Sequence, residues 1–417
     1  MSHQYQPLQS NKGIIRISLF EILAVLYIAH KVLPVVGYYM PSVAYLGLFG
    51  LTFFLALPLF QYKAAWTMLG MFAVSLLSLI SRLLDSTSSG ALYLYGELQT
   101  YLYGIIALRV IAGGDKKDCR RMFMIILGMY LFTGITTYIG AINYPGASRM
   151  LATLSGTDLL YRIYVKENIG SFTFVYELVL LTPLLIYLTR KKNIRPILGY
   201  VLIVFVGLVI VATEYGMAVM LYFASLVLLV FPKLTSKKLM ILLLVLLIVF
   251  VVGAELVANV FEQLSLSVDS ETLAERFLAV AETLRGEDEL SVTTGQTRME
   301  LYSKSVKSFW DTTFMGTWGT GGIGGHSFVL DALGNYGILG IIGLLMVFIT
   351  MYNLALKPYR EYDFHPYLLW VYCVAVFLMV MNPKVYSFTF LCVIPLFGNM
   401  LKDDERSKEH EIPLDRK

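Results

Sequence analysis

Long apolar runs separated by short polar segments make up most of the chain. A helix that crosses a bilayer needs about 20 predominantly apolar residues, and these runs are close to that length. Inside lipid the backbone must satisfy its own hydrogen bonds, so each run is expected to be an α-helix. The pattern predicts twelve spans, at 15–36, 41–60, 65–84, 91–112, 121–142, 169–189, 196–213, 216–232, 238–258, 327–353, 367–381 and 385–401.

The composition favours the same class of protein. Hydrophobic residues make up 57% of the chain and charged residues only 15%, whereas a soluble domain has about 25% charged residues. We therefore expect an all-α polytopic integral membrane protein with about 12 transmembrane helices. The net charge of +4 is too small to indicate a general polyanion-binding role, so no nucleic-acid partner is expected. The three cysteines lack the spacing of a zinc or redox site.

The distribution of lysine and arginine among the short loops predicts the orientation, because cytoplasmic loops carry an excess of these residues. With both termini in the cytoplasm, the basic short loops fall on the cytoplasmic side. These basic residues are Lys12, Arg16, Lys63, Lys116, Lys117, Arg120, Arg121, Arg190, Lys191, Lys192, Arg195, Lys233, Lys237, Lys238, Lys357 and Arg360. The chain then divides into nine spans (1–258), an extracytoplasmic loop (259–326), three spans (327–401) and a cytoplasmic tail (402–417).

Two longer loops then lie outside the membrane, at about 143–168 and 259–326. Within the second, apolar residues recur at helical spacing in SETLAERFLAVAETL (270–284) and in RMELYSKSVKSFWD (298–311). Both segments are predicted to be amphipathic helices near the membrane surface. No internal repeat is visible, so the inverted-repeat signature of many transporters is missing from the sequence.

The segment 293–345 contains the most informative group of residues. Arg298 begins the second amphipathic segment, and His326 precedes a long apolar run. Between them a glycine-rich turn contains Gly316, Gly319, Gly321, Gly322, Gly324 and Gly325. Such a turn lets a ligand approach the backbone closely and leaves amides free to bind an anion. The alternative interpretation is a flexible loop in which His326 only caps the helix that follows.

An arginine on a helix, a glycine-rich turn, a histidine and then N-Y-G-x-x-G together resemble the O-antigen ligase and Wzy-type polysaccharide polymerase superfamily. Its usual form is a G-x-G turn, then H-[NS]-x-x-L and a glycine-containing helix. This sequence has His326, Ser327, Leu330, Gly337 and Gly340 at the corresponding positions. The number of spans and the place of the large external loop also agree, so the resemblance covers nearly the whole chain.

This resemblance implies a GT-C-like helical fold in the bacterial inner (cytoplasmic) membrane. It implies an extracytoplasmic glycosyltransferase that polymerises polyprenyl-diphosphate-linked oligosaccharide repeat units into capsular, exo- or O-antigen polysaccharide, without a metal or other cofactor. The implied partners are that lipid-linked oligosaccharide, membrane lipid, and proteins of polysaccharide export and chain-length control. Other interpretations are a ligase that moves finished glycan to another acceptor, a lipid-linked oligosaccharide flippase or other transporter, and a structural or receptor-like membrane protein.

The chemistry of glycosyl transfer favours particular side chains. A transfer outside the membrane needs a lipid-linked donor, because nucleotide sugars are not supplied there. Cationic groups must stabilise the departing diphosphate, and the planar fork of arginine can bind phosphate oxygens bidentately. Histidine can orient or deprotonate the acceptor hydroxyl near neutral pH. We therefore predict Arg298 and His326 as catalytic residues, with Gly322, Gly324 and Gly325 contacting substrate.

One feature of the family is missing. Many members carry Ser-Arg-Gly in an earlier external turn, where this chain has ATEYGMAV (212–219), with Tyr215 and a glycine but no basic residue. An Arg-x10-Gly pattern described for some polymerases is also missing at the external arginines. Tyr215 stays a candidate substrate contact, and Arg149, Arg162 or Lys166 could supply the positive charge.

Ionisable residues inside the predicted spans are costly in lipid and should face the bundle interior or a watery cavity. Glu97 and Glu177 lie in the outer halves of their spans, and Arg82 lies near the outer end of another. They either form buried ion pairs between helices or line a sugar-binding cavity that opens outward. The tyrosine-rich segment 91–104 offers aromatic faces to sugars, although interfacial anchoring is the commoner use of tyrosine.

Overall fold

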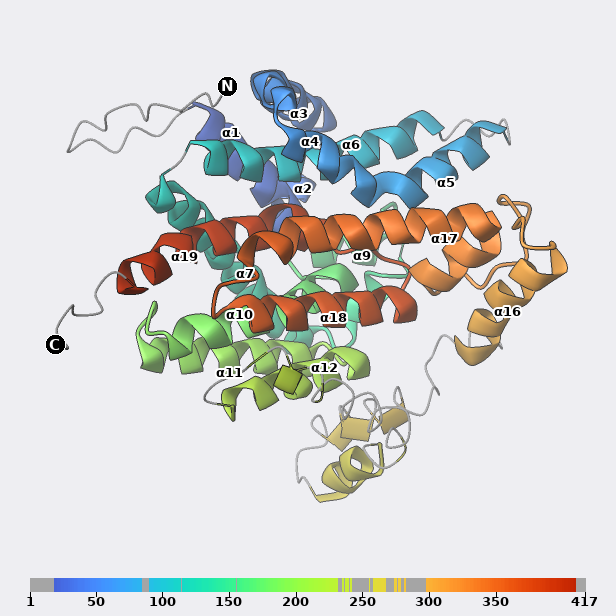
Figure 1. Ribbon diagram of the computed structural model, residues 1–417. Helices are drawn as coiled ribbons and strands as arrows, with labels where there is room; N and C mark the ends of the chain where they lie inside the picture. Colours follow the sequence, from blue (N-terminus) through green and yellow to red (C-terminus); the bar gives the residue numbers. More distant parts are fainter. Residues whose placement is uncertain are drawn as a thin grey trace, which may run out of the picture.

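The computed structural model describes residues 19–84, 90–113, 115–154, 156–231, 258–267 and 298–409, together with scattered residues between 235 and 282. All regular secondary structure in these ranges is helical, as the apolar pattern predicts (Figure 1). Predicted span 238–258 and predicted helix 270–284 lie largely outside the described residues. The predicted helix at 298–311 is confirmed as α16 (Arg298–Asp311).

The helices follow one another along the chain with short connections. They are α1 (Leu19–Val32), α2 (Pro34–Tyr39), α3 (Ser42–Ala56), α4 (Lys63–Met68), α5 (Ala73–Leu84), α6 (Gly90–Ala112), α7 (Lys116–Asn143), α8 (Ala147–Met150), α9 (Leu159–Lys166), α10 (Phe172–Arg190), α11 (Pro196–Ala212), α12 (Gly216–Leu226), α16, α17 (Phe328–Ala355), α18 (His365–Met381) and α19 (Ile394–Glu409). Short 3-10 turns connect α3 to α4, α4 to α5 and α17 to α18, and a π-helical turn, Thr389–Val393, precedes α19.

Five helical stretches are long and apolar enough to cross a membrane. They are Ser42–Gln61, Lys63–Leu83, Lys116–Asn143, Phe172–Arg190 and Phe328–Tyr359. Four shorter apolar helices, Pro196–Ala212, Gly216–Leu229, His365–Met381 and Thr389–Lys402, coincide with four further predicted spans. These helices fit an α-helical membrane protein, while the total of twelve spans stays a prediction.

The exposed surface supports the membrane assignment. Large apolar side chains on these helices are strongly exposed, including Val43 (80% exposed), Phe54 (67%) and Ile197 (81%). Soluble monomers rarely expose large contiguous apolar surface. In contrast, every residue of α10 from 174 to 189 is buried, so α10 lies at the centre of the bundle, packed against α11, α12 and α18.

The first predicted span, 15–36, is wrong as a single helix. α1 ends at Val32, and Leu33 has an extended backbone (φ −106°, ψ 99°) before α2 starts at Pro34. Proline disfavours a helical conformation in the residue that precedes it, which explains the break. The backbone N–H of Val35 donates instead to Asn168 Oδ1, in the segment that connects α7 to α10, at 3.1 Å.

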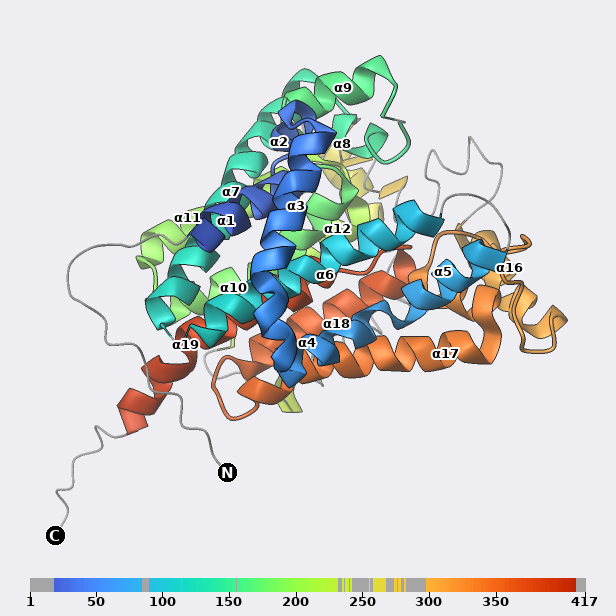
Figure 2. The ribbon, with the colours of Figure 1, turned by 90° about the horizontal axis from the view of Figure 1, so that it is seen from above.

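The segment 143–168, predicted to lie outside the membrane, contains two short helices, α8 and α9, that the sequence pattern did not predict (Figure 2). α8 and α9 pack on each other through a small separate core of Ala147, Leu151, Tyr164 and Ile169. Asn168 connects this unit to α7, because its Nδ2 donates to Thr136 Oγ1 at 2.9 Å. The loop is therefore a folded cover on the bundle.

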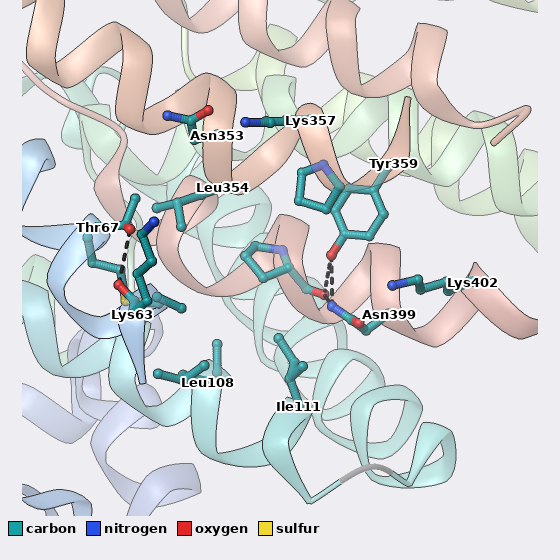
Figure 3. A pocket seen from close by; sticks show the side chains of 15 residues that line it. Lys63, Thr67, Leu108, Ile111, Asn353, Leu354, Lys357, Tyr359, Asn399 and Lys402 are labelled. Carbon is teal, nitrogen blue, oxygen red and sulfur yellow. Dashed lines mark hydrogen bonds between the residues drawn. The ribbon is translucent and has the colours of Figure 1, made fainter. Parts of the chain in front are cut away.

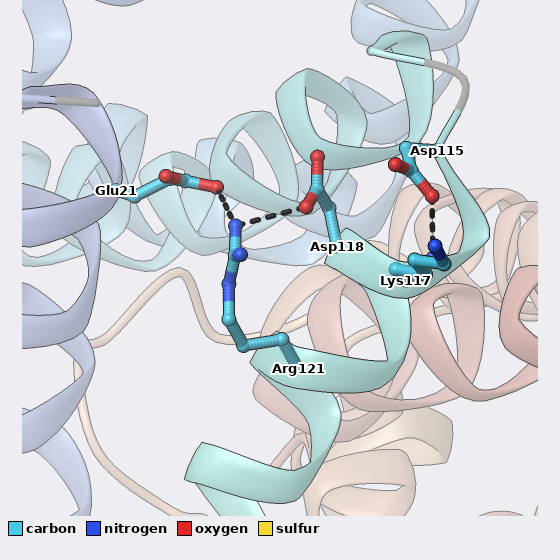
Figure 4. Close-up of polar contacts among 5 residues, drawn as sticks. All are labelled: Glu21, Asp115, Lys117, Asp118 and Arg121. Carbon is cyan, nitrogen blue, oxygen red and sulfur yellow. Dashed lines mark hydrogen bonds and ion pairs between the residues drawn. The ribbon is translucent and has the colours of Figure 1, made fainter. Parts of the chain in front are cut away.

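Basic segments that the sequence assigns to one side of the membrane meet at one end of the bundle. Arg121 at the start of α7 contacts Glu21 of α1 at 2.5 Å and Asp118 at 2.8 Å (Figure 4). Where α10 ends beside the start of α18, Lys191 pairs with Asp363. Which end faces the cytoplasm stays a prediction.

Candidate functional site

The predicted catalytic residues belong to one helix–turn–helix unit. α16 begins at Arg298, the glycine-rich turn follows, and α17 begins at Phe328, two residues after His326. The N-cap of α17 is Ser327, whose Oγ accepts a hydrogen bond from the N–H of Leu330 at 3.0 Å. This cap satisfies one of the donors at the helix start and fixes the chain direction beside His326.

The glycine-rich turn packs tightly between α16 and α17. A Cβ at Gly324 would overlap the carbonyl oxygen of Leu301 on α16. A Cβ at Gly337, which has φ +55° inside α17, would overlap the carbonyl oxygen of Phe314. The Gly322 carbonyl accepts a hydrogen bond from Ser308 Oγ. Glycine is therefore needed for close backbone packing here, independently of any ligand.

Asp331, in the first turn of α17, holds this turn in place. Its Oδ1 accepts from Ser305 Oγ at 2.6 Å and from the Gly325 N–H at 3.1 Å, and its Oδ2 accepts from the Ser327 N–H at 2.9 Å. Ser305 Oγ in turn accepts from the Gly324 N–H at 2.9 Å. A carboxylate is favourable at a helix N-terminus, and hydrogen bonds to it are among the stronger ones.

These contacts correct one expectation. The amides of Gly324 and Gly325 were expected to be free for an anion, but they already donate to Ser305 and Asp331. The Asp331 carboxylate binds an amide that was expected to bind an anion, because the glycine-rich turn folds back over the first turn of α17. The sequence analysis did not single out Asp331, although it follows His326 by only five positions.

The two predicted catalytic residues differ in how far the structure describes them. His326 is partly buried and lies between two residues whose amides Asp331 holds. The backbone of Arg298 starts α16, while its side chain lies outside the described part. Position 298 is one helical turn before Tyr302, whose hydroxyl donates to the Met381 carbonyl at 2.9 Å. This face of α16 therefore approaches the end of α18.

A second group of polar residues lies beside the start of α17. The Phe328 N–H donates to the Asn382 carbonyl at 2.9 Å. This bond places the α18–α19 connection beside Phe328, which follows His326 by two residues. Asn382 Nδ2 and Tyr386 Oη are buried, and the two side chains interact with each other without making a hydrogen bond of normal geometry to any described residue. Leaving such a group unsatisfied costs about 1–3 kcal/mol. Water or a hydroxyl-bearing ligand would remove that cost. The sequence analysis did not single out Asn382 or Tyr386.

Aromatic contacts connect this group to the turn between α11 and α12. The ring centroids of Tyr386 and Tyr176 are 6.4 Å apart, and those of Tyr176 and Tyr215 are 6.0 Å apart. Tyr215 Oη donates to the Ser148 carbonyl at 2.8 Å. Burial is the main cause that raises the pKa of Tyr215, and the nearby charge of Arg149 acts against it. Tyr215 and Arg149 are thus brought together.

The other two candidate cations do not share this position. Arg162 and Lys166 are exposed side chains on α9. Among the three basic residues proposed to compensate for the missing arginine, Arg149 is the one that the structure brings to the Tyr215 turn. Ser148 is buried and anchors that position, since its Oγ also donates to the Gly170 carbonyl at 2.6 Å.

Glu177 forms the buried ion pair that one of the two interpretations predicts. It is 4% exposed, and its Oε1 lies 3.7 Å from Lys31 Nζ of α1. Tyr130 Oη of α7 donates to Glu177 Oε2 at 2.5 Å. Glu97 is half-buried on α6 and Arg82 is exposed on α5, outside the contacts described above. Through these contacts Glu177 joins α1, α7 and α10.

Metal ligands do not gather within the part of the chain that the structure describes. There, no group of three or more His, Cys, Asp or Glu side chains could hold a metal ion. Comparison with known proteins gives no match, either to a protein-family model or to a curated protein. Any function must therefore be argued from the residues and contacts above.

Proposed function

We propose that this chain is an extracytoplasmic glycosyltransferase that polymerises polyprenyl-diphosphate-linked oligosaccharide repeat units. The observation that carries the proposal is the fixed position of His326. The hydrogen bonds of Asp331 hold the turn on both sides of this histidine. The same helix start is bonded to the backbone of Asn382, whose buried Nδ2 makes no hydrogen bond of normal geometry among the described residues.

In the proposed reaction, a hydroxyl of the acceptor sugar attacks the anomeric carbon of the donor sugar. A new carbon–oxygen bond forms as the bond to the diphosphate breaks, and the diphosphate leaves with the electron pair. His326 takes the proton of the attacking hydroxyl. Arg298 stabilises the negative charge that develops on the leaving diphosphate, and Arg149 beside Tyr215 contributes a second positive charge.

The surroundings of His326 suit a sugar. The unpaired Asn382 amide and Tyr386 hydroxyl can hydrogen-bond to sugar hydroxyls, which would satisfy them in the buried site. The rings of Tyr176, Tyr215 and Tyr386 add flat apolar faces nearby. All of these groups come from segments distant from α16 in sequence.

The test is a reconstitution with purified full-length protein and synthetic undecaprenyl-diphosphate-linked oligosaccharides. Product length is read by gel and mass spectrometry. Growth of the chain by whole repeat units supports a polymerase, and transfer to an unrelated acceptor supports a ligase. If neither product forms with a panel of repeat units, the enzyme proposal fails.

Substitutions make this test specific for the two residues. Losing one contact to a charge that develops in the transition state typically costs about 3–4 kcal/mol, so Arg298→Ala or His326→Ala should each lower the rate by roughly 100-fold or more. Arg298→Lys should restore little, because a point charge does not reproduce the arginine fork. Arg276→Ala and Arg285→Ala are the controls and should be much milder. Each variant must reach the membrane at normal abundance. Normal polymer from well-expressed His326→Ala would refute its catalytic role.

A transporter of lipid-linked oligosaccharide is the second candidate. The buried pair of Lys31 and Glu177 favours it, because ionisable residues inside membrane bundles often mark transport paths. The same protein in proteoliposomes separates the two functions. Movement of the lipid-linked substrate between leaflets, without any change in glycan length, would support transport over polymerisation.

A further inference from the structure

A cavity lies at the opposite end of α17 from His326. It measures about 430 Å³ and opens between the start of α4, the ends of α6 and α17, and α19 (Figure 3). A volume of this size lies within the range of small-molecule sites. Lysines, a tyrosine, asparagines and several apolar side chains line it.

All charged side chains that line this cavity are positive. Three lysines line it, Lys63, Lys357 and Lys402, and each comes from a different segment of the chain. None of its lining residues is acidic. Three like charges around one cavity repel one another, and an anion between them would turn that repulsion into attraction. Lys63 and Lys357 also belong to loops predicted to be cytoplasmic, and Lys402 opens the predicted cytoplasmic tail.

One wall of the cavity is built around a buried tyrosine. Tyr359 is 2% exposed, and its Oη donates to the Pro395 carbonyl at 3.2 Å. Asn399 Nδ2 donates both to Tyr359 Oη at 2.8 Å and to the Pro395 carbonyl at 2.9 Å. These bonds fix α19 against the turn after α17. The cavity is therefore shaped by residues that are already hydrogen-bonded to one another.

Most of the remaining lining is apolar. Met68, Leu108, Ile111 and Leu354 line the cavity, together with the polar Thr67 and Asn353. A free inorganic anion gains nothing from such a surface. A phospholipid does, because it carries a phosphate, a glycerol and acyl chains on one molecule. The inner leaflet also supplies anionic headgroups that attract lysines.

We propose that this cavity binds a phosphate group, supplied by the headgroup of an anionic phospholipid in the cytoplasmic leaflet. The lysines contact the phosphate, and the apolar wall contacts the glycerol and the first carbons of the acyl chains. This proposal does not depend on the glycosyltransferase proposal, since the cavity shares no residue with the His326 site. A free phosphate ion has the same chemistry at the lysines and is distinguished by the test.

The test uses the full-length protein, purified in detergent and exchanged into nanodiscs of phosphatidylcholine with or without phosphatidylglycerol. Native mass spectrometry measures the phosphatidylglycerol retained per protein. The pocket variant carries Lys63→Gln, Lys357→Gln and Lys402→Gln. The control variant removes the same charge from exposed positions of the predicted cytoplasmic side, with Lys117→Gln, Arg120→Gln and Lys192→Gln.

A lysine near an anionic lipid surface contributes about 1 kcal/mol, or about fivefold in affinity. The pocket variant should therefore retain phosphatidylglycerol at least tenfold more weakly, while the control variant stays within about twofold of the wild type. If the pocket variant does not fold, Lys357→Gln alone should weaken retention by about fivefold. Equal loss in the control and pocket variants would overturn the proposal, because a diffuse surface charge would then explain binding.

A competition arm identifies the source of the phosphate. Dioctanoyl phosphatidylglycerol should displace the retained lipid at micromolar concentration, and inorganic phosphate should need at least a hundredfold more. That result supports the lipid headgroup. Displacement by both at the same concentration would overturn the lipid source. Retention that is unchanged in the pocket variant and resistant to both competitors would overturn the site itself.

Discussion

Asp331 offers the sharpest test of how the candidate site is built. Replacing it with alanine removes three acceptor contacts, to Ser305 Oγ and to the backbone N–H groups of Gly325 and Ser327. A hydrogen bond to a charged partner contributes about 1.5–3 kcal/mol. We take the low end and discount it further, because Gly325 is exposed and Asp331 partly so. The expected loss is about 3 kcal/mol for the closed form of the turn.

This loss of free energy should make the glycine-rich turn open more often. About 3 kcal/mol corresponds to roughly 100-fold in an equilibrium constant, so the amides of Gly324, Gly325 and Ser327 should exchange hydrogen roughly 100-fold faster in Asp331→Ala. Asp331→Asn keeps one acceptor oxygen but turns a donor toward the Ser327 N–H. It should cost about half as much, or roughly tenfold in exchange.

The measurement is hydrogen–deuterium exchange of the purified full-length protein, read by mass spectrometry on peptides that cover 312–330. Asp311→Ala is the matched control, since Asp311 is an exposed aspartate at the end of α16. It should leave the exchange unchanged. If Asp331→Ala exchanged like the wild type in this segment while Asp311→Ala did the same, the carboxylate would not be what holds the turn, and the reasoning above would fail.

Three further predictions concern the Lys31–Glu177 ion pair, the membrane orientation and the need for a metal. Glu177→Gln should lower the free energy of unfolding in detergent by about 2 kcal/mol, because Lys31 loses its partner in a largely buried site. A double variant with Lys31→Met and Glu177→Gln should recover part of that loss. An unchanged melting temperature of Glu177→Gln would contradict a stabilising ion pair. An Asp288→Cys variant should react with a membrane-impermeant thiol reagent in intact cells. Labelling only after permeabilisation would contradict the predicted topology. Glycosyl transfer should persist in EDTA; loss that a divalent cation restores would show that a metal is needed.

The apolar pattern determined most of the helices. Hydrogen bonding within a helix is local, and lipid allows few alternatives, so run length and composition are enough to predict a helix such as Phe172–Arg190. The pattern failed at Pro34, although that proline was a visible signal. It also missed α8 and α9, because a short helix on a folded loop has neither the length of a span nor a long amphipathic repeat.

The sequence also placed Arg298, the glycine-rich turn and His326 in order, since they lie within one short segment. It could not predict what that segment meets. Asn382 and Tyr386 lie more than fifty positions after His326, yet the first of them bonds to the start of α17. Their buried, unpaired groups became visible only once the neighbouring helices were in place.

Tertiary structure alone decided which charges act together. Tyr215 and Ser148 are 67 positions apart, and their hydrogen bond selects Arg149 over Arg162 and Lys166 as the cation near that turn. The physical reason is that side-chain partners in a helical bundle are set by how helices pack, and many packings are compatible with the same apolar runs. Local composition fixes the helices, whereas the fit between their surfaces fixes the site.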